Sequence, residues 1–234
     1  MERYDPNLDA WSAGPHLLEA RFGAAAAVVD GFIYVAGGHD GRHAISSVER
    51  LPLVSMIGDA KWSPAPGLSV PRLLAAAQVL DRTLFVIGGT DTGTHSHCTA
   101  EWLDLEAWRW KIDNIPRQLT QRLGASMASC AGSGVLLLAG GYADGDTELR
   151  ALASAERFNA VGRAWSPLPS MSTARIAAAA TAADGDIYIL GGRRDNAGAA
   201  LASVERWSAR RERWEVLPAM GTPRDAVAAT VSRF

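Results

Sequence analysis

A pair of adjacent glycines recurs four times along this chain at an almost constant interval. The pairs are Gly37-Gly38, Gly88-Gly89, Gly140-Gly141 and Gly191-Gly192. They are separated by 51, 52 and 51 residues, and each one ends a short apolar run. A period near 50 residues, in which an apolar strand runs into a turn, indicates a repeat architecture. This feature constrains the fold more than any local propensity does.

Three further residue types keep the same period. An arginine precedes each glycine pair by 16 to 18 residues, and a fifth opens the last segment: Arg21, Arg72, Arg122, Arg175 and Arg224. A glutamate follows each pair by 12 to 16 residues: Glu49, Glu101, Glu156 and Glu205. A tryptophan comes next, at Trp62, Trp110, Trp165 and Trp214, and Trp11 opens the series near the N-terminus. Four marker types in one register indicate that the repeat spans the whole chain.

The order strand, Gly-Gly, variable loop, Glu-Arg-aromatic, Trp resembles the Kelch repeat, which is one four-stranded blade of a β-propeller. The resemblance implies an all-β fold and a single Kelch β-propeller domain. The Pro71-Arg72 and Pro223-Arg224 pairs make it most similar to the propellers of Kelch-like (BTB-Kelch) proteins. Leu51 and Leu103 depart from the pattern, because an aromatic residue usually follows Glu-Arg.

The markers divide the chain into blades. We expect four complete blades at residues 17–66, 67–115, 116–169 and 170–219. Residues 1–16 are expected to form the last two strands of an incomplete blade, and residues 220–234 its first strand, over 226–231. The strand between them is missing, and unpaired strand edges are a liability. The sequence therefore predicts a piece of a larger propeller with five or six blades.

Alanine-rich runs open each blade, for example Ala24–Ala27 and Ala177–Ala180. Alanine favours helix, but the period predicts strands here, since first strands converge on the propeller axis where large side chains do not fit. The repeated glycines are expected to end the second strand where neighbouring chain comes close. The tryptophans are expected to pack between blades. Pairs such as Glu205-Arg206 are expected to form ion pairs or backbone hydrogen bonds between strands.

Composition excludes several classes of function. The formal net charge is −2 and the pI is about 6.2, which gives no support for nucleic-acid binding. The two cysteines, Cys98 and Cys130, form no disulfide framework and favour a reducing compartment. No signal peptide or membrane span is predicted, so we expect a cytoplasmic protein. We expect no cofactor and no metal, although His95-Ser96-His97-Cys98 has suitable ligand types.

The five arginines are the best candidates for binding a partner. Each stands at the entrance of a first strand, so by symmetry they surround one mouth of the central channel. In Kelch propellers that act as substrate receptors, the resemblance implies that arginines at this place bind acidic side chains of a peptide. Guanidinium groups bind carboxylates well. The alternative is that they pair with local acids and carbonyls and only rim the channel.

The loops after the glycine pairs open on the same face and add further candidate partner-binding residues. These are His39, Arg42, His43, His95, Tyr142, Arg193 and Arg194. Polar loops on a rigid repeat frame are where binding specificity usually lies. We therefore predict a shallow pocket at the channel mouth that takes a short acidic peptide.

The predicted function is a non-enzymatic protein-interaction module, since no catalytic constellation stands out. By resemblance it is a substrate-recognition propeller of a cullin–RING ubiquitin ligase adaptor, whose BTB domain is not in this chain. Two alternatives stay open at this stage. One is an actin-associated or other scaffold protein that binds through other surfaces. The other is a small-molecule enzyme on the same fold, such as a sugar-acid epimerase.

Overall fold

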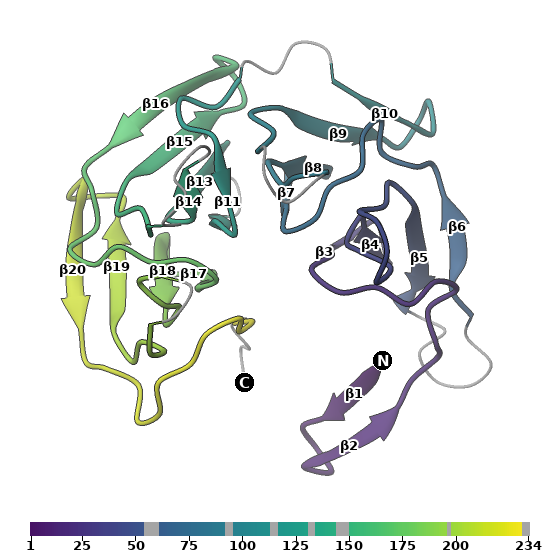
Figure 1. The fold of residues 1–234 in the computed structure, drawn as a ribbon, viewed down its shortest axis with the longest axis horizontal. Helices are drawn as coiled ribbons and strands as arrows, with labels where there is room; N and C mark the ends of the chain where they lie inside the picture. Colours follow the sequence, from purple (N-terminus) through teal and green to yellow (C-terminus); the bar gives the residue numbers. More distant parts are fainter. Residues whose placement is uncertain are drawn as a thin grey trace.

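The computed structural model describes residues 1–53, 61–91, 96–112, 117–130, 134–143, 150–195 and 198–230. Four antiparallel four-stranded sheets surround a central axis, and a two-stranded hairpin lies next to the first of them (Figure 1). The predicted all-β Kelch-type propeller with four complete blades is confirmed. Each sheet lies within one of the four residue ranges expected for a blade.

The blades are numbered in chain order. Blade 1 contains β3 (Ala25–Val29), β4 (Phe32–Ala36), β5 (Val48–Pro52) and β6 (Ser63–Ala65). Blade 2 contains β7 (Ala76–Leu80), β8 (Thr83–Ile87), β9 (Ala100–Asp104) and β10 (Arg109–Lys111). Blade 3 contains β12 (Ser126–Ser129), β13 (Val135–Ala139), β15 (Ala155–Asn159) and β16 (Ala164–Leu168). Blade 4 contains β17 (Ala179–Ala183), β18 (Asp186–Leu190), β19 (Val204–Ser208) and β20 (Arg213–Leu217).

Two small sheets complete the set. The short strands β11 (Arg122–Leu123) and β14 (Tyr142–Ala143) pair at the inner end of blade 3. The hairpin of β1 (Glu2–Asp5) and β2 (Ala10–Ala13) forms a sheet of its own.

Tight turns join the first and second strands of the blades. In blade 1, Val29 pairs with Phe32 across Asp30 and Gly31, whose φ angles are 49° and 76°. Blade 4 repeats this turn with Asp184 and Gly185, at 52° and 83°. Two successive positive φ angles are what a two-residue hairpin turn of the primed type needs. These turns hold the alanine-rich first strands in the sheet in spite of their helix propensity.

The paired glycines hold neighbouring blades together. The backbone N–H of Gly192 donates to the carbonyl of Arg224 (2.8 Å), and Gly38 and Gly141 make the same bond to Arg72 and Arg175. A Cβ at Gly191 would collide with the Arg224 carbonyl oxygen. The absence of a side chain therefore allows the end of one blade's second strand to touch the arginine segment of the next blade.

An open series of backbone hydrogen bonds, called the backbone ring below, runs round the channel at the same end. It links residues that stand two positions after each arginine and that all have positive φ: Gly23, Leu74, Gly124, Ala177 and Ala226. Each of the last four donates its N–H to the carbonyl of the preceding member, over 2.9 to 3.4 Å. This ring fixes the spacing of the blades at the channel mouth.

The hydrophobic core is divided among the blade interfaces. One cluster joins blades 1 and 2, a second joins blades 2 and 3, and a third joins blades 3 and 4. First strands of adjacent blades contact one another: β3 with β7, β7 with β12, and β12 with β17. This crowding near the axis agrees with the small side chains found there.

The two ends of the chain depart from the sequence-based expectation. Residues 226–230 form no strand, and 231–234 lie outside the described residues. In the described part of this segment, the Ala226 N–H donates to the carbonyl of Ala177 (2.9 Å). A strand needs a neighbouring ladder, and no second strand stands beside this segment in the described chain. Among the residues that the structure describes, the hairpin β1–β2 pairs with neither blade 1 nor the C-terminal segment, so the shared incomplete blade is not confirmed.

Candidate interaction face at the channel mouth

Four of the five repeated arginines are buried in one recurring cluster. In blade 4, Arg175 Nη2 donates to Glu205 Oε1 (2.8 Å) and to Ser203 Oγ (3.1 Å). Its Nη1 donates to the carbonyls of Gly191 (2.8 Å) and Ser203 (3.1 Å). The guanidinium therefore ties the glycine pair to the start of the third strand.

The glutamate completes each cluster. The Glu205 carboxylate also accepts from the backbone N–H groups of Ser172 (2.7 Å) and Thr173 (3.0 Å), just before the arginine. The same arrangement holds Arg21 with Glu49, Arg72 with Glu101 and Arg122 with Glu156, at N–O distances of 2.7, 2.9 and 2.6 Å. A buried charge is tolerated only when it is paired and hydrogen-bonded in this way.

Burial is nearly complete for these groups. The four arginine side chains are at most 1 % exposed, and their glutamates at most 3 %. Burial lowers the pKa of Arg72, Arg122 and Arg175, while the partner glutamate opposes that shift. Each of the four guanidiniums directs its donors at carbonyls, hydroxyls and the carboxylate of its own blade. The geometry argues against the predicted partner-binding role for these four arginines and favours the structural alternative.

Arg224 differs from the other four. Arg224 is exposed, and its side chain makes no hydrogen bond or ion pair with the part of the chain that the structure describes. Its backbone is held as in the other segments, by bonds to Gly192 (2.8 Å) and Leu201 (3.0 Å). Arg224 is therefore the one predicted ring arginine of the described chain whose charge faces solvent.

The loop after the first glycine pair lies beside the arginine segment. His39 forms an isolated antiparallel β-bridge with Phe22, and the centroids of the two rings lie 5.0 Å apart. The backbone N–H groups of Arg42 and His43 both donate to the Asp40 carboxylate (2.6 Å each). These bonds lower the pKa of Asp40 and hold the loop tip as a turn. The side chains of Arg42 and His43 are exposed.

The matching loop of blade 4 is built in the same way. Arg193 bridges to Ile176 and Ala200 in the backbone, and its side chain pairs with Asp225 (3.4 Å). Arg194 is exposed. In blade 3, Tyr142 is half-buried, and burial raises its pKa while the charge of Arg193 lowers it. His95, the remaining predicted loop residue, lies outside the described residues.

Sequence reasoning did not predict two apolar residues on this face. Phe22 follows the first repeated arginine and is 59 % exposed, whereas Leu123 and Ile176, at the same place in blades 3 and 4, are each 2 % exposed. Leu74 stands on the backbone ring and is 40 % exposed. The available signal was the repeat itself, since Phe22 is the one aromatic residue that follows a repeated arginine.

The repeated tryptophans and Glu-Arg pairs have structural partners. Trp62, Trp110 and Trp214 donate their indole N–H to the carbonyls of Pro15, Pro66 and Pro169, which precede their blades. Trp165 is 8 % exposed, but Trp11 is 68 % exposed and does not fit the predicted packing between blades. The arginines next to the glutamates turn outward. Arg50 stacks over Phe32 and Trp108, and Arg206 pairs with Glu215 (2.5 Å).

Comparison with known proteins identifies the repeat. The model of the Kelch motif matches residues 20–69, 71–112, 124–172 and 174–221. The chain is 28 % identical over 200 residues to Kelch-like protein 25 of Xenopus tropicalis, covering 81 % of this chain and 31 % of that protein. Kelch-like protein 25 of Homo sapiens is 29 % identical over 196 residues, with the same coverage of each chain. Kelch-like protein terF of Aspergillus terreus is 24 % identical over 199 residues, covering 81 % and 42 % of the two chains.

The fold has a counterpart among solved structures. The structure of YjhT superposes with a TM-score of 0.81 at 12 % identity, covering 94 % of this chain and 77 % of that one. This likeness concerns the fold alone. The chain spans about a third of the length of the Kelch-like protein 25 sequences it matches. Among the residues described, no helix is long and apolar enough to cross a membrane.

Proposed function

Because this chain belongs to the family of Kelch-repeat proteins, we propose that it is a protein-interaction module that binds a partner on the loop face around its channel mouth. The relatives of this chain that carry Kelch-like names support an interaction role. Backbone bonds from Gly38, Gly141 and Gly192 to the next arginine segment hold the ends of three second strands at this face, where the following loops begin. This end is rigid, because the backbone ring and four buried ion pairs hold it.

One observation carries the proposal: exposed cationic and apolar side chains gather on this face although the buried arginines do not contribute. Arg42, Arg194 and Arg224 are exposed, and Phe22 and Leu74 lie close to the backbone ring. Large exposed apolar residues beside cations are typical of interfaces with proteins.

The chemistry of the face favours an acidic partner. Asp40 already accepts bonds from its own loop, and Asp225 already pairs with Arg193, so these two acids are engaged within the face, whereas Asp91 is exposed. Exposed arginines bind carboxylates in a bidentate manner. The partner we propose is a peptide segment that carries carboxylates and a small apolar anchor for Phe22 and Leu74. Cytoplasmic location belongs to the same proposal.

The test compares two triple variants in affinity capture followed by mass spectrometry. The face variant carries Phe22→Ala, Arg42→Ala and Arg194→Ala. The matched control removes one apolar residue and two arginines from turns at the opposite end of the blades: Val161→Ala, Arg82→Ala and Arg163→Ala. Partners lost by the face variant and retained by the control support the proposal.

Retention of every partner by the face variant would contradict the proposal and favour a scaffold that binds through other surfaces. Turnover of a small molecule without any protein partner would favour the enzyme alternative. Both variants must keep the wild-type circular dichroism spectrum, which all these exposed positions permit.

We extend the proposal to substrate recognition for a cullin–RING ubiquitin ligase. This step rests only on the resemblance to Kelch-like proteins, and the adaptor domain would lie outside residues 1–234. The chain alone is therefore expected to capture its substrate but no cullin. Direct capture of a cullin by residues 1–234 would contradict the proposal that a separate adaptor domain binds the cullin.

A further inference from the structure

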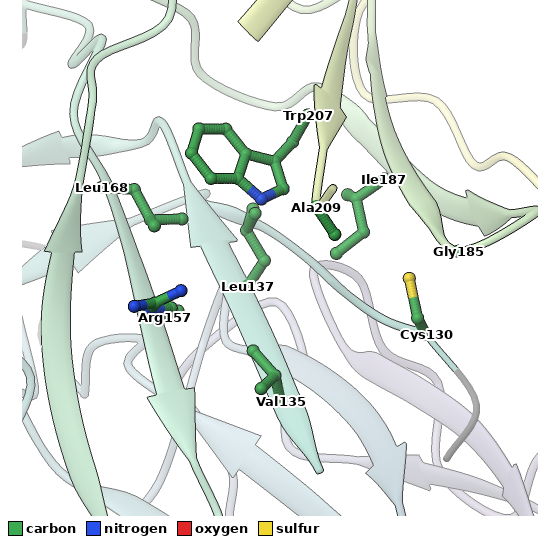
Figure 2. A pocket seen from close by; sticks show the side chains of 9 residues that line it. All are labelled: Cys130, Val135, Leu137, Arg157, Leu168, Gly185, Ile187, Trp207 and Ala209. Atoms are coloured by element: carbon green, nitrogen blue, oxygen red, sulfur yellow. The ribbon is translucent and has the colours of Figure 1, made fainter. Parts of the chain in front are cut away.

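A pocket lies between blades 3 and 4, apart from the interaction face. Blade 3 contributes Cys130 and Leu137 to its lining, and blade 4 contributes Ile187, Trp207 and Ala209 (Figure 2). Its volume is about 120 Å³. An engineered apolar cavity of about 150 Å³ binds benzene, so the smaller volume of this pocket limits a ligand to one small ring.

The repeat explains why the space exists here. Tyr34 of blade 1 pairs with Arg50 as Leu137 of blade 3 pairs with Arg157, so Tyr34 and Leu137 are equivalent. Leu105 follows Glu101 by four residues, as Ala209 follows Glu205. Tyr34 and Leu105 fill the interface of blades 1 and 2. Their smaller counterparts leave the interface of blades 3 and 4 underfilled.

Trp207 gives the pocket an unused hydrogen-bond donor. This residue is only 5 % exposed, and its indole N–H makes no hydrogen bond to any residue that the structure describes. Figure 2 shows the indole nitrogen turned towards Leu137, on the side of the pocket. The indole N–H groups of Trp62, Trp110 and Trp214 each find a carbonyl acceptor, whereas that of Trp207 opens onto the pocket. The unmet donor points to a ligand that brings an acceptor.

The thiol of Cys130 closes one side of the pocket as a neutral group. Its sulfur donates to the carbonyl of Asp186 (3.7 Å). Burial, with a smaller effect of the Asp186 charge, raises the pKa of this thiol. The thiol is therefore uncharged and weakly nucleophilic near neutral pH. Arg157, at the edge, is engaged with Ser166 (3.1 Å) and Glu212 (3.2 Å). The lining thus offers apolar contact and one free donor, without a free charge.

We propose that this pocket binds a small uncharged molecule that has a compact apolar body, the size of one six-membered ring, and one hydrogen-bond acceptor. The acceptor takes the Trp207 indole N–H, and the ring packs against Leu137 and Ile187. Binding is non-covalent. A ligand here would contact two blades at once and would favour the blade arrangement described here.

The test uses cyclohexanone, which carries an acceptor, and benzene, which lacks a carbonyl. Ligand-observed saturation-transfer NMR and titration of the indole ¹H–¹⁵N signals report binding to the intact chain. We expect saturable binding of cyclohexanone that shifts the Trp207 indole signal. We expect benzene to bind several-fold more weakly, since a net hydrogen bond contributes about 1 kcal/mol.

Three variants separate the parts of the proposal. Cys130→Leu fills the pocket with leucine, the residue that stands at the corresponding strand end of blade 2 (Leu80). This variant should lose binding without loss of thermal stability. Trp207→Phe keeps an aromatic wall and removes the donor, so the affinity of this variant for cyclohexanone should fall to that for benzene. Cys98→Ala, which removes the other thiol, should bind as the wild type does. No saturable binding to the wild type, or equal binding by Cys130→Leu, would overturn the proposal.

Discussion

The arginine segments of blade 4 and of the chain's last part have the same backbone but different side-chain environments. Arg175 donates its N–H to Leu152 (3.1 Å) and accepts from Gly141 (2.8 Å), while Arg224 makes the matching bonds to Leu201 (3.0 Å) and Gly192 (2.8 Å). Yet the Arg175 side chain is fully buried and Arg224 is exposed. Two different parts of the molecule therefore control the backbone and the side chain.

The preceding blade sets the backbone, because its glycine pair and loop supply the hydrogen bonds. The arginine's own blade sets the side chain, because a glutamate on its third strand receives the guanidinium. Arg175 has Glu205 for this purpose. Glu2, which occupies the corresponding place by sequence spacing, lies in β1 in a separate sheet. The comparison teaches that a repeated residue acquires its structural role only when its partner strand is paired beside it.

The largest expected effect comes from removing the glutamate. Glu205→Gln leaves the Arg175 charge buried without its counter-ion, and breaking a buried pair costs about 3–5 kcal/mol. Urea unfolding should show that loss. The matched control is Glu212→Gln, since Glu212 is 67 % exposed and its pair with Arg157 lies at the surface; it should change stability by less than about 1 kcal/mol. Similar losses of unfolding free energy in both variants would contradict the conclusion that the buried glutamate gives Arg175 its structural role.

The second effect comes from the arginines themselves. Arg175→Met should destabilise the protein by about 2–4 kcal/mol, because Glu205 loses its counter-ion and the Gly191 carbonyl loses a donor. Arg224→Met should lie within about 0.5 kcal/mol of the wild type, as exposed substitutions usually do. Thermal unfolding of both variants gives the measurement. A large loss at Arg224 would mean that this side chain has a structural partner after all.

The third prediction tests whether the glycine pair of one blade holds the backbone of the next arginine segment. Gly191→Ala should destabilise by about 1–3 kcal/mol, because a Cβ would collide with the Arg224 carbonyl and φ is +64°. Gly185→Ala has the same conformational problem at φ +83° but open space around its Cβ, so its loss should be smaller. Differential unfolding of the two variants isolates the contact between blades. Equal losses of stability in the two variants would mean that the positive φ accounts for the whole effect and that the contact with the Arg224 carbonyl adds nothing.

The smallest effect concerns Glu215, a carboxylate of the same blade whose side chain is 16 % exposed. Arg206, Arg213 and Arg211 lower the pKa of Glu215 to about 2, from an ordinary value of 4.5. A carboxylate with a lowered folded-state pKa stabilises the protein above pH 4.5 and loses that contribution as the pH falls towards 2. Glu215→Gln should therefore reduce the acid dependence of stability in that window, and only slightly. An unchanged pH profile would show that solvent screens this network completely.

Much of the architecture follows from the repeated markers. The glycine pairs, glutamates and tryptophans located four four-stranded blades, and Asp30-Gly31 located a hairpin turn, because each depends on residues close in the sequence. The candidate site was harder to predict. The sequence placed the arginines at the channel mouth, but their partners lie about 30 residues away on the third strand. Spacing alone could not show whether each arginine side chain faces solvent or the glutamate of its own blade.

The sequence by itself determined the repeat, the strand order within each blade and the end of the blades where the loops gather, since these depend on local periodicity and turn chemistry. Only the tertiary structure decided which repeated residues are buried. Arg175 and Arg224 have the same place in the repeat, and so do Trp165 and Trp11, yet each pair divides into a buried and an exposed member. The physical reason is that burial of a charged or large side chain requires a neighbouring strand with a matching partner, and that neighbour is far away in sequence.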